Sequence, residues 1–336
     1  MQNFRKFLVP FSWLYQAITG LRNSLYDKGV LESRQFELPV ICVGNLSVGG
    51  TGKSPMVEFL ISFLSSRFSV ATLSRGYKRK TKGFLLVQGS EKAHEVGDEP
   101  LQFKKKYPEI LVAVDEVRTR GIQNLMELTN PPEVIVLDDA FQHRKVKAGL
   151  NILLTAYGNL FSDDAVLPAG NLRESSSGRN RAHIVVVTKC PLELTSEAKE
   201  KIACRLRLSA NQALFFTGIG YSKKVYNRSG AVDFSQFKGK AVTLVTGIAQ
   251  PETLVAYLRS KDLEFEHLNF PDHHNFTTNE LELIRSKGLI LTTEKDYMRL
   301  EGEIPQSKLF YLPISTLFLG GEDAFRESVL EYVTKK

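Results

Sequence analysis

Short runs of β-branched and other apolar residues alternate with segments of helical spacing from Leu38 to Tyr221. This alternation is typical of a P-loop NTPase-like, mostly parallel sheet with helices on both faces, which is a doubly wound α/β fold. The strands that we expect lie at residues 39–43, 70–74, 110–114, 134–138, 151–155 and 184–188. We therefore assign residues 36–220 to the main domain.

The pattern changes after this domain. Residues 221–240 are polar and basic and include Gly230 and Gly239, so we interpret them as a linker that can hold a hairpin. A second, smaller α/β domain is expected over residues 241–336. Its expected strands are 241–245, 264–268, 289–292 and 309–312, and its expected helices lie near 251–260, 279–286 and 322–333.

Residues 1–35 have the pattern of an amphipathic helix. Apolar residues recur there at steps of three and four, namely Phe4, Phe7, Leu8, Phe11, Leu14, Tyr15, Ile18, Leu21 and Leu25. Such a stripe is compatible with a helix that packs on the protein's own core. Trp13, Tyr15 and the basic flanks favour the other interpretation, a helix that lies in a membrane interface.

The composition narrows the class of partner and the cellular setting. A formal net charge of +7 indicates an anionic partner, and nucleotide phosphates, phospholipid head groups and nucleic acid all fit. The three cysteines show no C-x-x-C spacing, which argues against a disulfide framework and a zinc site and favours a reducing cytosol. No apolar run approaches the roughly 20 residues that a membrane-spanning helix needs.

A glycine-rich turn follows the first expected strand and precedes an apolar helix. This order of strand, loop and helix is that of a Walker A site. The residues that we expect to bind the nucleotide phosphates are Ser47, Val48, Gly49, Gly50, Thr51, Gly52, Lys53 and Ser54. The backbone N–H groups of such a turn wrap a polyphosphate, Lys53 reaches the outer phosphates, and Ser54 is a candidate ligand for Mg²⁺.

Two further segments refine this site. The apolar strand 134–138 ends in Asp138 and Asp139, which is the Walker B arrangement of metal-binding carboxylates. Thr188 and Lys189 begin like a guanine-binding loop, but the carboxylate that reads guanine is missing two positions later. We therefore expect ATP and Mg²⁺ as the nucleotide and the metal.

The ordered motifs together resemble the tetraacyldisaccharide 4′-kinase family over nearly the whole chain. The matching blocks are residues 43–55, 73–77 (Leu-Ser-Arg-Gly-Tyr), 96–100 (Val-Gly-Asp-Glu-Pro), 137–143 (Leu-Asp-Asp-Ala-Phe-Gln-His), 167–174 (Leu-Pro-Ala-Gly-Asn-Leu-Arg-Glu), 270–274 (Phe-Pro-Asp-His-His) and 292–296 (Thr-Thr-Glu-Lys-Asp). The family's loop also begins with a hydroxyl residue, as Ser47 does here. Ser54 stands where threonine is frequent, and either hydroxyl can serve the metal.

The resemblance implies a lipid A kinase of Gram-negative bacteria. Its reaction is transfer of the ATP γ-phosphoryl group to the 4′-hydroxyl of an acylated disaccharide 1-phosphate. The expected location is peripheral, at the cytoplasmic face of the inner membrane, where the protein meets an anionic surface. We expect a monomer and no nucleic-acid partner.

The resemblance also implies roles for individual residues. Asp98 is the expected base, with His273 as its partner, although His274 beside it leaves that choice open. Asp138 and Asp139 are expected at the metal, and Arg75 at the developing phosphate charge. Asn171, Arg173 and Glu174 are expected to bind the glycolipid or support the metal. From the residues alone, an aspartate in a turn and an arginine on the surface are common without any such role.

Other functions are compatible with parts of this pattern. A cytosolic small-molecule kinase or synthetase of the P-loop class would share the nucleotide site without acting on lipid. The basic charge also suggests a nucleotide switch or a nucleic-acid-binding ATPase. The missing guanine-reading carboxylate argues against the switch, and the absence of interleaved aromatic and basic residues argues against nucleic acid.

Overall fold

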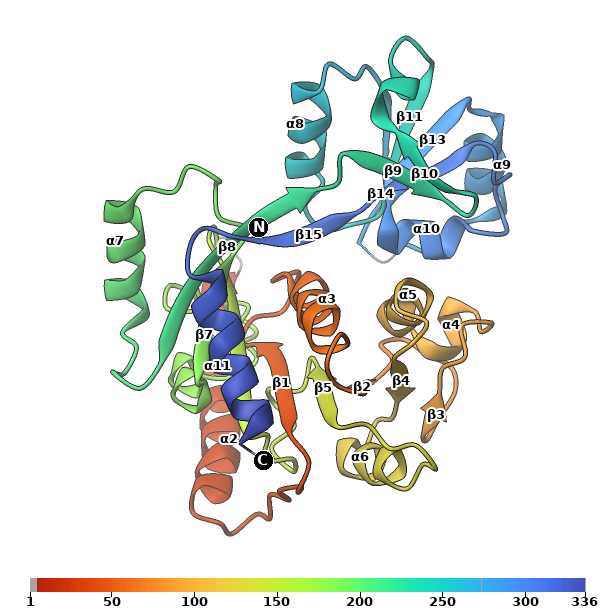
Figure 1. Ribbon diagram of the computed structural model, residues 1–336. Coiled ribbons are helices and arrows are strands. Elements are labelled where there is room, and N and C mark those ends of the chain that lie inside the picture. The colour runs from red at the N-terminus through yellow and green to blue at the C-terminus, as the bar shows by residue number, and fades with distance from the viewer. Residues whose placement is uncertain (1–4, 273, 336) are drawn as a thin grey trace.

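A computed structural model describes residues 5–272 and 274–335 of the chain. Within these residues the strands form two sheets, one of nine strands and one of six. We call the nine-stranded sheet and the helices that cover it the first lobe, and the six-stranded sheet with its helices the second lobe (Figure 1). The expected α/β class, with mostly parallel sheets, is confirmed.

The first sheet has the order β15-β8-β7-β6-β1-β5-β2-β4-β3. Its strands are β1 (Val40–Asn45), β2 (Val70–Ser74), β3 (Leu85–Leu86), β4 (Leu111–Val114), β5 (Val134–Asp138), β6 (Leu150–Ala156), β7 (Ile184–Thr188), β8 (Ala213–Tyr221) and β15 (Ile314–Phe318). The strands from β8 to β4 are parallel, and the two outermost strands, β15 and β3, pair antiparallel with their neighbours. Strand β1 therefore lies inside the sheet, between β5 and β6.

Helices cover both faces of this sheet. The inner strands β1 and β5 are therefore buried along their whole length. They are α3 (Lys53–Leu64), α4 (Ala93–Val96), α5 (Asp98–Lys106), α6 (Arg118–Met126), the short η2 (Ser176–Arg181), α7 (Ser196–Leu206) and α11 (Glu322–Thr334). Alternate residues of β1 face opposite sides, as the pleat requires. Ile41 and Val43 pack with α3 in one core cluster, and Val40 and Cys42 belong to the other.

The second sheet has the order β10-β9-β14-β13-β11-β12. Its strands are β9 (Lys224–Asn227), β10 (Gly230–Asp233), β11 (Val242–Thr246), β12 (Glu266–Asn269), β13 (Leu289–Thr293) and β14 (Leu309–Leu312). Its helices are the short η3 (Phe234–Phe237), α8 (Glu252–Ser260), α9 (Thr278–Ser286) and α10 (Glu294–Leu300). Figure 1 shows α10 on the side of the second lobe that faces α5 of the first.

The two lobes do not have the boundaries that the sequence pattern predicts. The expected linker forms the β9–β10 hairpin, which belongs to the second sheet. Residues 314–334 return to the first lobe, because β15 pairs with β8 and α11 packs into the first core. The prediction of one domain over residues 241–336 missed this return. The sequence around a strand does not indicate which of two sheets the strand joins. The second lobe is therefore inserted between two parts of the first.

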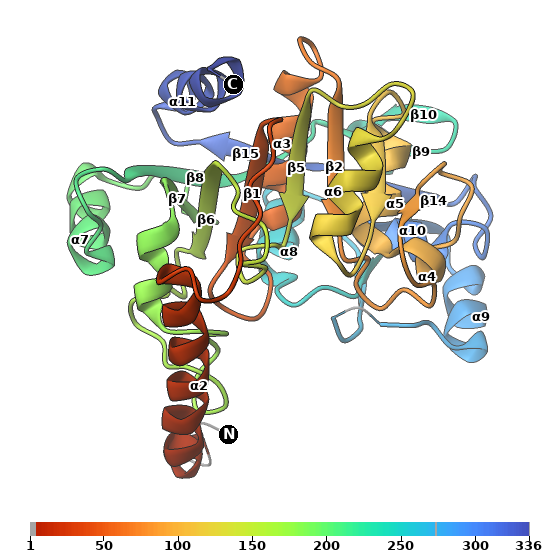
Figure 2. The ribbon, with the colours of Figure 1, turned by 90° about the horizontal axis from the view of Figure 1, so that it is seen from below.

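The N-terminal segment forms the short η1 (Lys6–Leu8) and the helix α2 (Val9–Asp27). Pro10 lies in the first turn of α2, where proline is tolerated, so the helix continues without a break. Figure 2 shows α2 extending away from the rest of the molecule. Most of the predicted stripe faces solvent, with Phe7 78%, Phe11 62%, Leu14 62%, Ile18 60% and Leu21 64% exposed. Phe4 lies outside the described residues.

Hydrogen bonds fix one side of α2 to the first lobe. The backbone N–H of Ala169 donates to Ser12 Oγ at 2.9 Å, and the Tyr15 hydroxyl donates to the carbonyl oxygen of Arg173 at 3.1 Å. Asn23 Nδ2 donates to Glu174 Oε2 at 2.6 Å. In the described part of the chain, no helix is long and apolar enough to cross a membrane.

Replacing Phe325 with alanine should show that α11 belongs to the first lobe. Its ring is fully buried and makes edge contacts with Phe59 and Phe215. Removal of a buried phenylalanine costs about 3–5 kcal/mol of the free energy of unfolding, which urea denaturation measures. Glu327→Ala, an exposed change on the same helix, is the control. Equal stability of the two variants would contradict this packing.

Candidate active site

The phosphate loop, residues 47–54, joins the end of β1 to the start of α3. Gly49 and Gly52 have φ values of +103° and +81°, a conformation that side chains with a Cβ rarely adopt. Two hydrogen bonds hold Thr51 in place, from Asn45 Nδ2 to its hydroxyl and from the Thr188 hydroxyl to its carbonyl oxygen, both at 2.8 Å. The loop is open at Gly49, where an added Cβ would meet nothing within 4 Å.

Strand pairing brings two carboxylates to this loop. Because β5 runs parallel to β1, with Val43 opposite Asp138, the ends of both strands lie at one edge of the sheet. Lys53 Nζ lies 3.7 Å from Asp139 Oδ1. Arg173 Nη1 donates to both oxygens of Asp139, at 3.0 and 3.2 Å. The structure thus places a lysine of the loop and a strand-end aspartate side by side.

The two aspartates differ in their electrostatic surroundings. Burial raises the pKa of Asp138 to about 7, and the charges of Asp139 and Glu99 add to the effect. Burial acts in the same direction on Asp139, but the cations of Lys53 and Arg173 outweigh it, so the pKa of Asp139 lies below its usual value. A buried carboxyl beside two other carboxylates is a position that a cation would stabilise.

Mg²⁺ fits the residues at this edge. Asp138 Oδ1 is buried and has no hydrogen-bond partner in the described part of the chain, and the Ser54 side chain is buried in the first turn of α3. No cluster of three or more His, Cys, Asp or Glu side chains arranged for a metal occurs within residues 5–272 and 274–335. Mg²⁺ needs no such cluster, because one or two carboxylates together with substrate phosphates usually hold it.

Asp98 lies beside the turn that carries Arg75, because two loops approach each other closely at glycines. Gly97 has a φ of +99° and immediately precedes α5, and its Cβ would lie 3.1 Å from Gly76 Cα. At Gly76, with a φ of +68°, a Cβ would lie 2.6 Å from the carbonyl oxygen of Val96. The close contact places the turn that carries Arg75 against the start of α5, where Asp98 is the first residue.

Asp98 and its neighbour Glu99 bind the second lobe through α10. Arg299 donates from Nε and Nη2 to Asp98 Oδ2, with an Nε···Oδ2 distance of 3.1 Å. Lys295 Nζ donates to Glu99 Oε1 at 2.6 Å. The expected partner of Asp98, His273, lies outside the described residues. His274 Nε2 donates to Glu280 Oε2 at 2.9 Å, within the second lobe.

Two arginines, Arg75 and Arg118, lie near Asp138 and Asp139. Arg75 is exposed, whereas Arg118 is buried at the start of α6. Burial and these two arginines lower the pKa of His143 to about 4, so its ring is neutral at physiological pH. A neutral imidazole in this place adds no charge to a site that already holds several cations.

The three residues expected at the glycolipid have different surroundings. Asn171 donates from Nδ2 to Asp164 at 3.0 Å and accepts from Arg5 at 2.9 Å. Arg173 binds Asp139, as described above. Glu174 is buried, and three side chains donate to its carboxylate, those of Asn23, Gln142 and Arg181. This carboxylate fixes α2 to the segment that follows β5.

Sequence reasoning had assigned no role to Glu99, Lys295 or Arg299. The pairs of Lys295 with Glu99 and of Arg299 with Asp98 link segments about 200 positions apart, which no local pattern reveals. The available signals were the quoted blocks 96–100 and 292–296, to which Glu99 and Lys295 belong. Arg299 lies four residues after Lys295, on the same face of α10.

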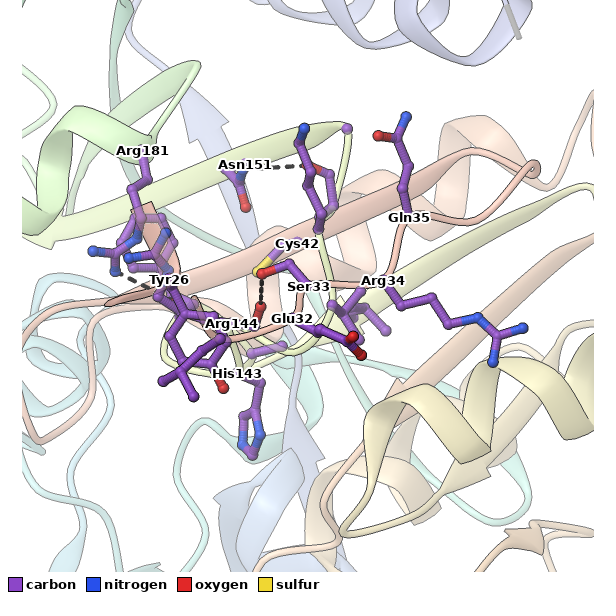
Figure 3. Close-up of a pocket in the computed structure, with 18 of the residues that line it drawn as sticks. Tyr26, Glu32, Ser33, Arg34, Gln35, Cys42, His143, Arg144, Asn151 and Arg181 are labelled. Carbon is purple, nitrogen blue, oxygen red and sulfur yellow. Dashed lines mark hydrogen bonds between the residues drawn. The ribbon is translucent and has the colours of Figure 1, made fainter. Parts of the chain in front are cut away.

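A cavity of about 920 Å³ lies apart from the phosphate loop (Figure 3). It is bounded by the segment after α2, including Glu32 and Arg34, and by His143, Arg144 and Cys42. Its lining contains none of residues 47–54 and neither Asp98 nor Asp139. A nucleotide in this cavity would therefore not contact the phosphate loop, Asp98 or Asp139.

The chain is similar to known proteins over nearly its whole length. The family model described as tetraacyldisaccharide-1-P 4′-kinase (LpxK) matches residues 4–334. A tetraacyldisaccharide 4′-kinase of Flavobacterium johnsoniae is 50% identical, covering 99% of this chain and 98% of that protein. One from Bacteroides fragilis is 46% identical over 98% of this chain and 93% of that protein.

A solved structure agrees with these sequence matches. The crystal structure of LpxK from Aquifex aeolicus, described as an "apo" form in complex with ATP, superimposes with a TM-score of 0.78. It is 34% identical, and the match covers 98% of this chain and 99% of the other. The family, the relatives and the fold agree over the full length, so this chain belongs to the tetraacyldisaccharide-1-P 4′-kinase family.

Proposed function

We propose that the protein transfers the γ-phosphoryl group of ATP to the 4′-hydroxyl of an acylated disaccharide 1-phosphate. The observation that carries this proposal is the phosphate loop with Lys53 at 3.7 Å from Asp139, in a chain of this family. The full-length relatives do not favour a kinase or synthetase that acts on a small soluble molecule.

The first lobe supplies the nucleotide site in this proposal. Backbone N–H groups of residues 47–53 hold the phosphates at the N-terminus of α3, whose partial positive charge favours anions. Lys53 exchanges its contact with Asp139 for the outer phosphates. Ser54, Asp138 and Asp139 would hold Mg²⁺, which neutralises charge on the β- and γ-phosphates when it is bound.

The acceptor hydroxyl needs a base and a compensating charge. We assign the base to Asp98, whose carboxylate takes the proton of the 4′-hydroxyl as that oxygen bonds to the γ-phosphorus and ADP leaves. His273 is the proposed partner of this carboxylate, as the resemblance implies. Arg75 and Arg173 are the candidates for offsetting phosphate charge, because they lie on the loops next to Asp98 and Asp139.

We assign α2 to the membrane interface. Phe7, Phe11, Leu14, Ile18 and Leu21 of its apolar stripe are exposed, whereas Tyr15 and Asn23 hold the helix to the loop that ends in Arg173 and Glu174. A helix held in this way would bring the lipid surface next to the phosphate loop. An acylated substrate keeps its chains in the bilayer, since each exposed methylene costs on the order of 0.8 kcal/mol. The proposed location is the cytoplasmic face of the inner membrane.

The activity itself is tested by incubating the protein with labelled ATP and the acylated disaccharide 1-phosphate. We expect a second phosphate on the lipid. Lys53→Met should abolish it and weaken ATP binding measured by calorimetry, because the loop loses its only side-chain cation for the phosphates within residues 47–54. Lys201→Met, on the exposed face of α7, is the control. Labelling of a soluble acceptor alone would refute the lipid assignment.

Asp98→Asn should lower kcat by about 100-fold or more, as loss of general-base catalysis does, without weakening ATP binding. Steady-state kinetics at saturating ATP and calorimetric titration with ATP measure the two quantities. Asp262→Asn removes a carboxylate from an exposed position and should leave both unchanged. Wild-type turnover in Asp98→Asn would remove Asp98 from the mechanism.

Replacing Phe11, Leu14, Ile18 and Leu21 with glutamine should release the protein from anionic lipid vesicles. Burial of each such side chain contributes about 1.5–3 kcal/mol, so loss of four changes partitioning by orders of magnitude. Co-sedimentation measures it, and ATP binding should persist. The control replaces Leu192 and Leu283, exposed apolar residues away from α2. Undiminished sedimentation of the α2 variant would exclude this helix as the membrane contact.

A further inference from the structure

Two cations on one face of α10 meet two consecutive carboxylates at the start of α5. Lys295 and Arg299 are four residues apart and therefore lie on the same side of their helix. They bind Glu99 and Asp98 in that order, at 2.6 Å for Lys295 Nζ···Glu99 Oε1 and 3.1 Å for Arg299 Nε···Asp98 Oδ2. The second lobe thus contacts the first at the residue to which we assign the base.

The guanidinium of Arg299 is oriented from its own lobe. Asp296 is fully buried, accepts from the backbone N–H of Gly247 at 2.9 Å, and accepts from the Thr293 hydroxyl at 2.8 Å. Its other oxygen accepts from Arg299 Nη1 at 3.1 Å. One arginine therefore bridges Asp296, which is fixed to β11 and β13 through these contacts, and Asp98 of α5.

Several carboxylates act on the two cations of this contact. Arg299 interacts with the charges of Asp98, Asp296 and Glu99, and Lys295 with those of Glu99, Asp272 and Asp98. Only 9% of the Arg299 side chain and 17% of the Asp98 side chain are exposed. Solvent therefore screens this ion pair less than it screens an exposed one.

We propose that Arg299 is the positioning residue of Asp98, supplied by the second lobe, so that docking of α10 on α5 completes the catalytic arrangement. This inference rests on the proposed role of Asp98. Two N–H groups of Arg299 on one oxygen of Asp98 fix the orientation of this carboxylate. The Lys295–Glu99 contact holds the two helices in register beside it.

The alternative is that the pair only holds the lobes together. Other contacts cross the same junction, since Lys106 of α5, which also binds Glu58 of its own lobe, pairs with Glu294 of α10 at 2.9 Å. Lys105 of α5 also pairs with Glu301. Loss of Arg299 alone should leave these contacts in place and the lobes together. A fall in kcat in this variant would then report on the positioning of Asp98.

The test is a double-mutant cycle with the full-length protein, using Arg299→Gln, Asp98→Asn and the double variant. Arg299→Gln should lower kcat by about 10- to 100-fold, the cost of a misplaced catalytic group, with the KM for ATP unchanged. Arg299→Lys should restore part of the loss, because it keeps the charge without the planar fork. In the Asp98→Asn background, Arg299→Gln should have no further effect, because the group that it positions is absent.

Arg285→Gln is the matched control, since it breaks an exposed ion pair with Glu303 in the same lobe. Thermal melting monitors folding of every variant. Additive losses in the double variant, or unchanged kcat in a folded Arg299→Gln, would overturn the inference while the base role stands. Unchanged kcat in Asp98→Asn would instead refute the base role and the inference together.

Discussion

Parallel pairing of β1 with β5 is the contact on which the candidate site depends. It places the phosphate loop and Asp138 at the same edge of the sheet, because parallel strands end together. The backbone hydrogen bonds of a buried inner strand leave little freedom for this register to slip. The phosphate loop and the carboxylates proposed for its metal thus come from segments about 90 residues apart, and the Lys53–Asp139 ion pair joins them at 3.7 Å.

Three carboxyl groups, those of Glu99, Asp138 and Asp139, lie close together in this site, and nearby cations offset part of their repulsion. Asp138 is buried next to Asp139 and Glu99, and burial raises its pKa to about 7. Both neighbouring carboxylates form ion pairs. Asp139 pairs with Lys53 and Arg173, and Glu99 pairs with Lys295. Asp138 is therefore the member of the group best suited to a metal ion.

Much of the fold could be predicted from sequence, because long runs of β-branched residues identify buried parallel strands. Strands β2, β5 and β7 lie at the expected residues, and the glycine-rich loop follows β1 as its spacing indicates. Strand β8 was missed because Gly218 and Gly220 interrupt its apolar pattern, and without β8 the return of β15 to the first sheet could not be foreseen. Helix α10 was missed because it has only 7 residues.

Part of the candidate site could also be predicted from the sequence, and part could not. Lys53, Asp138 and Asp139 follow local rules of strand, loop and helix, so their proximity could be foreseen. The resemblance nominated Asp98, but its contact with Arg299 joins two lobes and depends on the path of the whole chain. The sequence pattern of α2 left two interpretations open, and only the exposure of its apolar stripe favours one of them.

The inserted position of the second lobe has a consequence for biosynthesis. Along the chain, β15 and α11, which complete the first lobe, follow the whole of the second lobe and are therefore synthesised after it. Until they emerge, Phe59 and Phe215 lack the rings of Phe318 and Phe325 that cover them. The first lobe is thus completed only after the inserted lobe has been synthesised in full.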